Sequence, residues 1–299
     1  MIRTSAQTQN PVWFYAFALG PVIIWAINMV VTRYAASVIE PISISFWRLS
    51  LAWLLLTPFL GKILYQHRQQ LQKNIMPCAV LASLGMVSYQ CLSYWAAQST
   101  TATNMSMINA LIPIFTIFVS LLLLAVRPNR YAIAGSVLSL CGLIFFIGHG
   151  SFAVLWQGTW QLGDGLMLIA VLAYALYGVL IRYWQMDLPL LLSVWLQISL
   201  AIIMHIPLIW LLGLQMLDQQ NIWPVVYAAI LPSIAAPFLW MKAMQTIGPN
   251  QATMFTHLGP ILTAVIAYIY LDEQWYFYHT VGAALAILGV VLAQKKSSI

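Results

Sequence analysis

Long apolar stretches alternate along this chain with short segments that are polar or contain proline or glycine. A helix needs about 20 largely apolar residues to cross a bilayer, so each stretch of that length is a candidate membrane-spanning helix. The pattern predicts an all-α integral membrane protein with ten transmembrane helices. They are expected at residues 13–33, 41–60, 76–96, 104–125, 131–149, 164–183, 189–212, 223–243, 250–271 and 277–294.

The composition agrees with this prediction. The 299 residues are 62% hydrophobic and 6% charged, whereas soluble domains carry about 25% charged residues. Too few charges remain to solvate a globular surface, which excludes a cytosolic enzyme and a disordered protein. The formal net charge of +6 comes from scattered Lys and Arg residues. Without a basic run no nucleic-acid partner is expected, and the expected surroundings are a lipid bilayer.

The positions of the cations predict the orientation in the membrane. If the loops alternate between two sides, one side carries ten of the twelve Lys and Arg residues. That side is cytoplasmic by the positive-inside rule, so we expect a multi-pass protein of the cell (inner) membrane with both termini in the cytoplasm. The ten cations are Arg3, Lys62, Arg68, Lys73, Arg127, Arg130, Arg182, Lys242, Lys295 and Lys296.

Three cations have two interpretations each. Arg33 and Arg48 lie on the other side, where they either have a functional role or pair with Glu40. Lys242 lies near the end of the eighth expected helix and is either a cytoplasmic anchor or a cation that binds a carboxylate.

The two halves of the chain repeat each other. Residues 96–142 align without a gap on residues 243–289, and the matched pairs include Pro113/Pro260, Gly135/Gly282 and Gly142/Gly289. Each half then has five helices, an odd number, so the second half enters the membrane the other way up. We expect two inverted-topology repeats, over residues 11–150 and 160–296. This architecture is typical of secondary transporters, which bind substrate near the bilayer midplane between the repeats.

Polar side chains inside membrane helices are costly and are the default candidates for substrate contact. The alternative is that they form interhelical hydrogen bonds that only hold the bundle together. The residues expected to line a cavity between the halves are Trp25, Asn28, Tyr89, Tyr94, Asn109, Tyr174, Tyr177, Trp240 and His257. Pro113 and Pro260 are expected to kink the fourth and ninth helices and to expose backbone carbonyls.

Motifs for nucleotide binding and catalysis are absent from the sequence. It has no phosphate-binding loop, so no ATPase subunit is implied. It has no catalytic Ser/His/Asp set and no metal-spaced cluster, so no cofactor and no metal are expected. The chain is therefore expected not to be an enzyme, and an integral-membrane enzyme is a remote alternative. A small-molecule substrate is the expected partner, and no oligomer is required.

Several short motifs occur in order along the chain: W-A-x-N-x-x-x-x-R-Y from Trp25, F-W-R at 46–48, W-M-K-A from Trp240, I-G-P-N-Q-A-T-M-F-T-H-L-G-P ending at Pro260, L-D-E-Q-W, and G-x-x-L-x-x-x-G. Together they resemble the drug/metabolite transporter superfamily, in particular its ten-helix branch with paired EamA domains. The resemblance covers essentially the whole chain and implies an exporter of small metabolites such as amino acids. It also allows a multidrug antiporter for lipophilic cations, which usually needs a carboxylate where helix 1 has Asn28.

The acidic positions bear on coupling. The acid typical after the fourth helix of each half is Glu273 in the second half but Val126 in the first, which favours a structural role for Glu273. All six Asp and Glu residues lie near helix ends, which leaves His257 as the titratable group best placed for coupling. Burial favours a neutral imidazole, so we expect facilitated diffusion or exchange.

Overall fold

The computed structural model describes residues 15–125, 128–151, 161–246 and 255–293, without the side chains of Met241, Met244, Gln245 and His257. Every regular element in these ranges is helical, as expected. Within these ranges, eight segments are long and apolar enough to cross a membrane: Ala16–Ala35, Pro41–Gln66, Ile75–Ala96, Ala102–Leu124, Arg130–Ile147, Leu162–Trp184, Leu190–Leu212 and Ile222–Trp240. They coincide with the first eight expected helices.

Several of these segments are built from more than one element. The first half comprises α1 (Ala16–Ala35), α2 (Pro41–Gln66), α3 (Arg68–Lys73), α4 (Ile75–Leu81), η2 (Ala82–Ser88), α5 (Tyr89–Ala96), α6 (Ala102–Asn109), α7 (Ile112–Leu124) and α8 (Arg130–Ile147). The second half comprises α10 (Leu162–Trp184), α11 (Leu190–Leu212), α12 (Ile222–Ile230), η3 (Leu231–Ala235), α13 (Ala236–Thr246), η4 (Thr256–Leu258), α15 (Gly259–Leu271) and α16 (Phe277–Ala293).

The last two helices are shorter than a full membrane crossing in the part of the chain that is described. α15 has 13 residues and α16 has 17, against the roughly 20 that a crossing needs. The ninth expected helix, 250–271, starts among residues 247–254, which lie outside the described ranges.

In the described part of the chain, two π-helical turns interrupt helices at positions that match between the two halves. η2 follows α4 and η3 follows α12, and both lie in helices that continue on either side. Residues 231–235 of η3 match residues 84–88 of η2 at the separation that relates Pro260 to Pro113. π turns inside α-helices occur frequently at functional sites.

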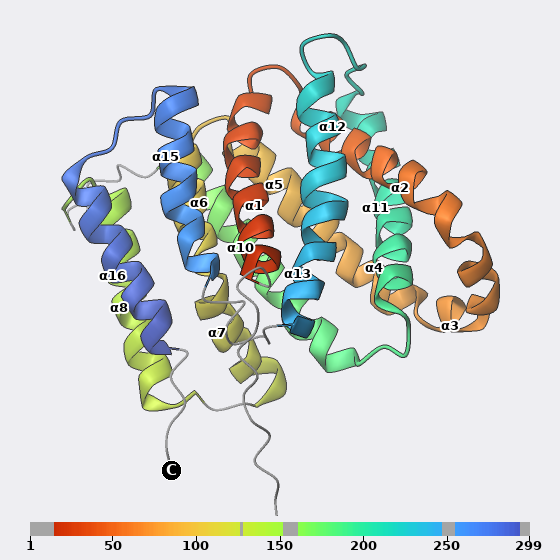
Figure 1. The fold of residues 1–299 in the computed structure, drawn as a ribbon, viewed down its shortest axis with the longest axis horizontal. Helices are drawn as coiled ribbons and strands as arrows, with labels where there is room; N and C mark the ends of the chain where they lie inside the picture. The colour runs from red at the N-terminus through yellow and green to blue at the C-terminus, as the bar shows by residue number, and fades with distance from the viewer. Residues whose placement is uncertain (1–14, 126–127, 152–160, 247–254, 294–299) are drawn as a thin grey trace, which may run out of the picture.

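α1 occupies the middle of the molecule, with α15 on one side and α12 and α13 on the other (Figure 1). It also packs against α5 and α6, and α10 packs against α5 and α7. Residues from both halves therefore surround the centre of the bundle.

α8 and α16 lie side by side along one edge of the molecule (Figure 1). Glycines allow this close approach: a Cβ at Gly289 would come within 2.6 Å of the Gly135 carbonyl oxygen, and one at Gly142 within 2.8 Å of the Gly282 oxygen. Because the obstacles are backbone atoms, no side-chain movement could make room. These four glycines are the ones that the internal repeat pairs.

Candidate functional site

Four of the expected site residues lie together where α5, α6 and α10 meet. The Tyr89 hydroxyl donates a hydrogen bond of 3.0 Å to Oδ1 of Asn109. The Tyr89 ring lies 4.7 Å from the Tyr174 ring, centroid to centroid, and Tyr174 stacks on Tyr177 at 5.3 Å. Tyr177 in turn covers Gly85 in η2, where a Cβ would come within 2.8 Å of the tyrosine ring. We call Tyr89, Asn109, Tyr174 and Tyr177 the tyrosine cluster; it brings hydroxyl, amide and aromatic groups together.

Trp25 of α1 and Trp240 of α13 form a second group. Their rings meet edge to face at 5.4 Å, an arrangement that aromatic pairs prefer. Both side chains are half-buried. α13, the helix that carries Trp240, lies on the opposite side of α1 from α15 (Figure 1).

Asn28 has an unsatisfied polar atom. It lies one turn along α1 from Trp25, and its Oδ1 is buried without a hydrogen-bond partner in the described part of the chain. A buried amide oxygen without a donor costs roughly 1–3 kcal/mol. A ligand that donates a hydrogen bond there would recover this energy.

The two expected kink prolines begin helices. Pro113 lies in the first turn of α7, and the chain leaves α6 at Asn109, so the fourth expected helix is broken at Ala110 and Leu111. Pro260 lies in the first turn of α15, after the 3-10 turn η4. A proline in the first turn loses no helical hydrogen bond, since the N–H there has no partner in the helix. The His257 side chain lies outside the described part of the structure.

Tyr94 belongs to a different group, centred on Arg48. Arg48 is 3% exposed and Tyr94 is 2% exposed. Nη1 of Arg48 donates to Oε1 of Gln90 at 2.7 Å and to the Tyr94 hydroxyl at 3.1 Å. Its Nη2 and Nε donate to the Ser233 hydroxyl at 2.7 and 3.3 Å. We call Arg48, Gln90, Tyr94 and Ser233 the arginine cluster.

The candidate list from the sequence lacked Arg48, although a signal for it was present. Arg48 lies inside an apolar stretch on the less basic side, and a pair with Glu40 was the simple explanation. The structure does not form that pair: Glu40 is exposed, and the groups that accept from Arg48 are all neutral. The partners come from α5 and η3, which the sequence alone could not bring beside α2.

The described carboxylates that are buried or half-buried act in helix contacts at one end of the bundle. Glu273 accepts hydrogen bonds of 2.7 and 3.1 Å from the first backbone N–H groups of α6, at Ala102 and Thr103. Asp164 accepts a 2.5 Å bond from the Thr100 hydroxyl. Arg33 donates to the Ala97 carbonyl at the same end. A carboxylate at a helix N-terminus is stabilised by the helix dipole, which gives Glu273 a structural role.

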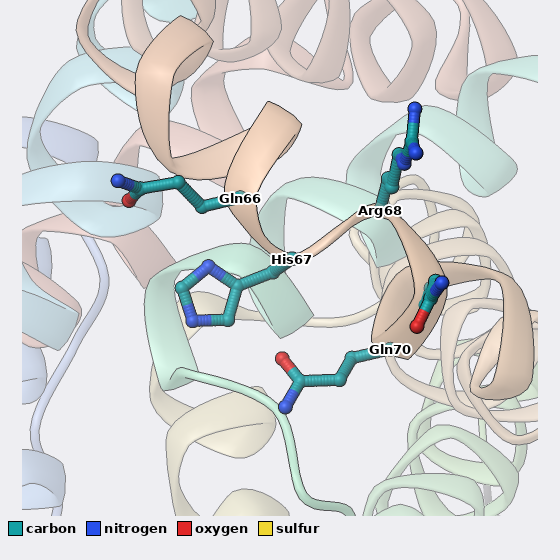
Figure 2. Close-up of a pocket in the computed structure, with 5 residues that line it drawn as sticks. Gln66, His67, Arg68 and Gln70 are labelled. Atoms are coloured by element: carbon teal, nitrogen blue, oxygen red, sulfur yellow. The ribbon is translucent and has the colours of Figure 1, made fainter.

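A polar groove lies at the other end of α2, where the chain turns into α3. It is lined by Gln66, His67, Arg68, Gln69 and Gln70. Figure 2 shows His67 and Gln70 extending to the same side while Arg68 points away from them. The groove is formed by five consecutive residues of one turn, so it does not join the two halves of the chain. No group of three or more His, Cys, Asp or Glu residues in the described part could hold a metal ion.

Comparisons with known proteins agree with this architecture. The EamA-like transporter family matches residues 12–148 and again residues 161–294. The chain is 24% identical to "Uncharacterized transporter YyaM" of Bacillus subtilis, over 93% of this chain and 92% of the relative. It is 24% identical to the "Probable terminal-alkyne amino-acid exporter" of Streptantibioticus cattleyicolor, over 77% of this chain and 76% of the relative. A solved crystal structure shares the fold with a TM-score of 0.64, at 13% identity over 94% of this chain and 96% of that chain.

Proposed function

This chain belongs to the EamA-like transporter family, and from that premise we propose that it is a secondary transporter that exports small metabolites such as amino acids. Transport follows alternating access through a central cavity between the two halves. The observation that carries this proposal is the tyrosine cluster, in which Tyr89 and Asn109 of the first half meet Tyr174 and Tyr177 of the second.

The proposed architecture is ten transmembrane helices in two five-helix inverted repeats, over residues 11–150 and 160–296. The glycine contacts between α8 and α16 support it. Gly135 and Gly282 match in the repeat, as do Gly142 and Gly289, and the contacts run crosswise from Gly135 to Gly289 and from Gly142 to Gly282. A twofold axis perpendicular to both helices produces this crosswise pattern, and inverted repeats have such an axis in the membrane plane. The π turns η2 and η3, which lie at matching positions in the two halves, also support the repeat.

The proposed cavity lining is the tyrosine cluster together with Trp25, Asn28, Tyr94, Trp240 and His257. The unsatisfied Oδ1 of Asn28 supports it, because a metabolite with an ammonium or hydroxyl group supplies the missing donor. The aromatic faces suit apolar or cationic parts of the same molecule. No ATPase subunit, cofactor or second copy of the chain takes part in this scheme.

The substrate class draws support from the curated relative named as an amino-acid exporter. A second candidate function is efflux of lipophilic cations, which the aromatic groups favour. That chemistry usually needs an embedded carboxylate to hold the cation or a proton, and helix α1 has the neutral Asn28 instead. Amino-acid export is therefore the better fit. The alternative of an integral-membrane enzyme has no support from the sequence, which contains no catalytic Ser/His/Asp set.

Purified protein in liposomes tests the proposal. Vesicles loaded with unlabelled amino acids should take up labelled amino acids by counterflow, and a cationic dye should not exchange. Asn28→Ala should reduce the uptake at least tenfold without lowering thermal stability, because it removes a buried oxygen that makes no hydrogen bond in the structure. Gln69→Ala removes an exposed amide on α3 and is the matched control. Dye exchange without amino-acid exchange would select the efflux alternative.

The coupling proposal is facilitated diffusion or exchange. Collapse of the pH gradient should leave counterflow intact, and His257→Gln should retain it. Strong accumulation driven by an imposed proton gradient, lost in His257→Gln, would make the protein a proton-coupled carrier instead.

A further inference from the structure

Arg48 is a buried positive charge with neutral partners. Its hydrogen bonds go to an amide oxygen, a phenol and a serine hydroxyl. No carboxylate among the described residues lies within ion-pair distance of it. A buried ion without a counter-charge carries a large desolvation penalty. Four hydrogen bonds offset part of this penalty, and an anion would offset much more.

We propose that the arginine cluster binds the carboxylate group of the transported metabolite. The inference rests on the proposed function, since it names the chemical group by which the transporter selects its substrates. Amino acids and related carboxylates are then substrates, whereas amines and lipophilic cations of similar size are rejected.

The geometry of the guanidinium fits a carboxylate. The N–H bonds of Nε and Nη2 point in parallel from one edge of the guanidinium, so they can bind both oxygens of a carboxylate at once. In the structure the hydroxyl of Ser233 accepts from both of these atoms, at 3.3 and 2.7 Å. One neutral oxygen thus occupies the place where a carboxylate would present two negative ones. A carboxylate bound in place of the Ser233 hydroxyl gives each of these two donors a separate anionic acceptor, and such bidentate Arg–carboxylate pairs are among the strong hydrogen bonds of proteins.

Gln90 and Tyr94 of the arginine cluster have hydrogen-bond donors that are not used within the cluster. Tyr94 and Gln90 accept from Nη1, and within the described part of the chain neither the Tyr94 hydroxyl proton nor the Gln90 amide protons have an acceptor. A carboxylate beside Arg48 would therefore meet additional N–H and O–H donors. Ser233 donates its own proton to the Ala228 carbonyl at 2.7 Å, so only its lone pairs face Arg48.

The position of Arg48 in its helix excludes a surface anchor. It is the eighth residue of α2, or about 10 Å along the helix at 1.5 Å per residue. A long cationic side chain at that depth could reach the membrane surface, but the guanidinium instead contacts α5 and η3 inside the bundle. Lys242, the other cation considered for carboxylate binding, is exposed.

The cluster also joins the two halves. Arg48, Gln90 and Tyr94 belong to the first half, and Ser233 lies in the π turn η3 of the second. A carboxylate that displaces Ser233 removes this link between α2 and η3. Substrate binding is thereby connected to the relative movement of the halves that alternating access requires.

Discrimination between a carboxylate and its uncharged analogue tests the inference. In amino-acid counterflow, unlabelled leucine is compared with leucinamide and isoamylamine as competitors, for the wild type and for Arg48→Gln, Arg48→Lys and Arg33→Gln. The wild type should prefer leucine over both analogues at least tenfold. Arg48→Gln should reduce this ratio to near one, and Arg48→Lys should recover only part of it, because an ammonium lacks the fork. Arg33→Gln removes a cation that contacts the Ala97 carbonyl and should keep the wild-type ratio.

The two proposals fail in different ways. If wild-type vesicles exchange no amino acid, the proposed function fails. If they exchange leucine and leucinamide equally, or if Arg48→Gln keeps the tenfold preference, the arginine cluster does not bind the carboxylate. The preference of the wild type for leucine over leucinamide is measured without any variant. Its absence would therefore contradict the inference even if Arg48→Gln does not fold.

Discussion

His205 exemplifies how a single buried polar residue is fixed in this bundle. Its Nδ1 lies 2.7 Å from the Ala201 carbonyl oxygen, which can only accept, so Nδ1 carries the proton. Its Nε2 lies 3.0 Å from the Ser45 hydroxyl oxygen and 3.6 Å from Sγ of Cys91, and in a neutral imidazole with the proton on Nδ1 this nitrogen is the acceptor. The imidazole is thus held in one neutral tautomer between α11 and α2.

Loss of this imidazole should cost stability. His205→Leu removes the imidazole acceptor of the buried Ser45 hydroxyl, and a buried polar group that loses its hydrogen bond costs roughly 1–3 kcal/mol. The melting temperature of the purified protein in detergent should therefore fall clearly. His67→Leu is the control, because His67 makes the same contact to a carbonyl one turn back, that of Ile63, but lies at the surface end of α2. Equal melting temperatures for the two variants would contradict the role given to His205.

Sequence reasoning at the residue scale identified polar atoms but not their partners. Tyr89, Asn109, Tyr174 and Tyr177 stood out because polar groups are rare in apolar stretches, and they meet in the structure. Arg48 did not stand out as a site, because its three partners lie 42, 46 and 185 positions away in the chain. Whether a charge meets an acid or a set of neutral acceptors is decided by tertiary packing, which a hydropathy pattern does not contain.

At the scale of helices, the glycine seam between α8 and α16 makes the sharpest stability prediction. Gly289→Ala places a methyl group within 2.6 Å of the Gly135 carbonyl oxygen, which cannot move aside. Overpacking of this kind typically costs about 1–3 kcal/mol. Gly165→Ala in α10 meets no atom within 4 Å and should stabilise the helix by about 0.5–1 kcal/mol. Thermal unfolding in detergent should thus move in opposite directions for the two variants, and a shared direction would argue against the close approach.

Helix positions were predictable because each apolar stretch has the length of a membrane crossing, but interruptions within them were only partly so. At the expected kink, a two-residue turn at Ala110 and Leu111 separates α6 from α7, and Pro113 was a visible signal for it. The π turn η2 contains no proline, and its Gly85 faces the ring of Tyr177 from the other half. Because this turn packs against a tyrosine that is distant in the chain, the residues of the turn itself give no signal that would predict it.

The whole molecule has a predicted orientation that can be measured. With ten helices and the cations on the inner side, epitope tags at Met1 and Ile299 should be inaccessible to antibody in intact cells and accessible in inverted vesicles. A tag inserted after Gln219, before α12, should behave in the opposite way. Termini on opposite sides would require an odd number of crossings and would remove the basis for the inverted repeat.

The crosswise glycine contacts have a consequence for the history of this fold. An interface in which residue i of one partner meets residue j of the other, and j meets i, is isologous, as in a twofold homodimer. Here both partners belong to one polypeptide, with Gly135 against Gly289 and Gly142 against Gly282. A five-helix chain carrying such a glycine pair would present a self-complementary face to a second copy inserted upside down. If the two halves are inverted repeats as proposed, this seam follows the contact rule by which two separate, oppositely oriented five-helix chains could assemble.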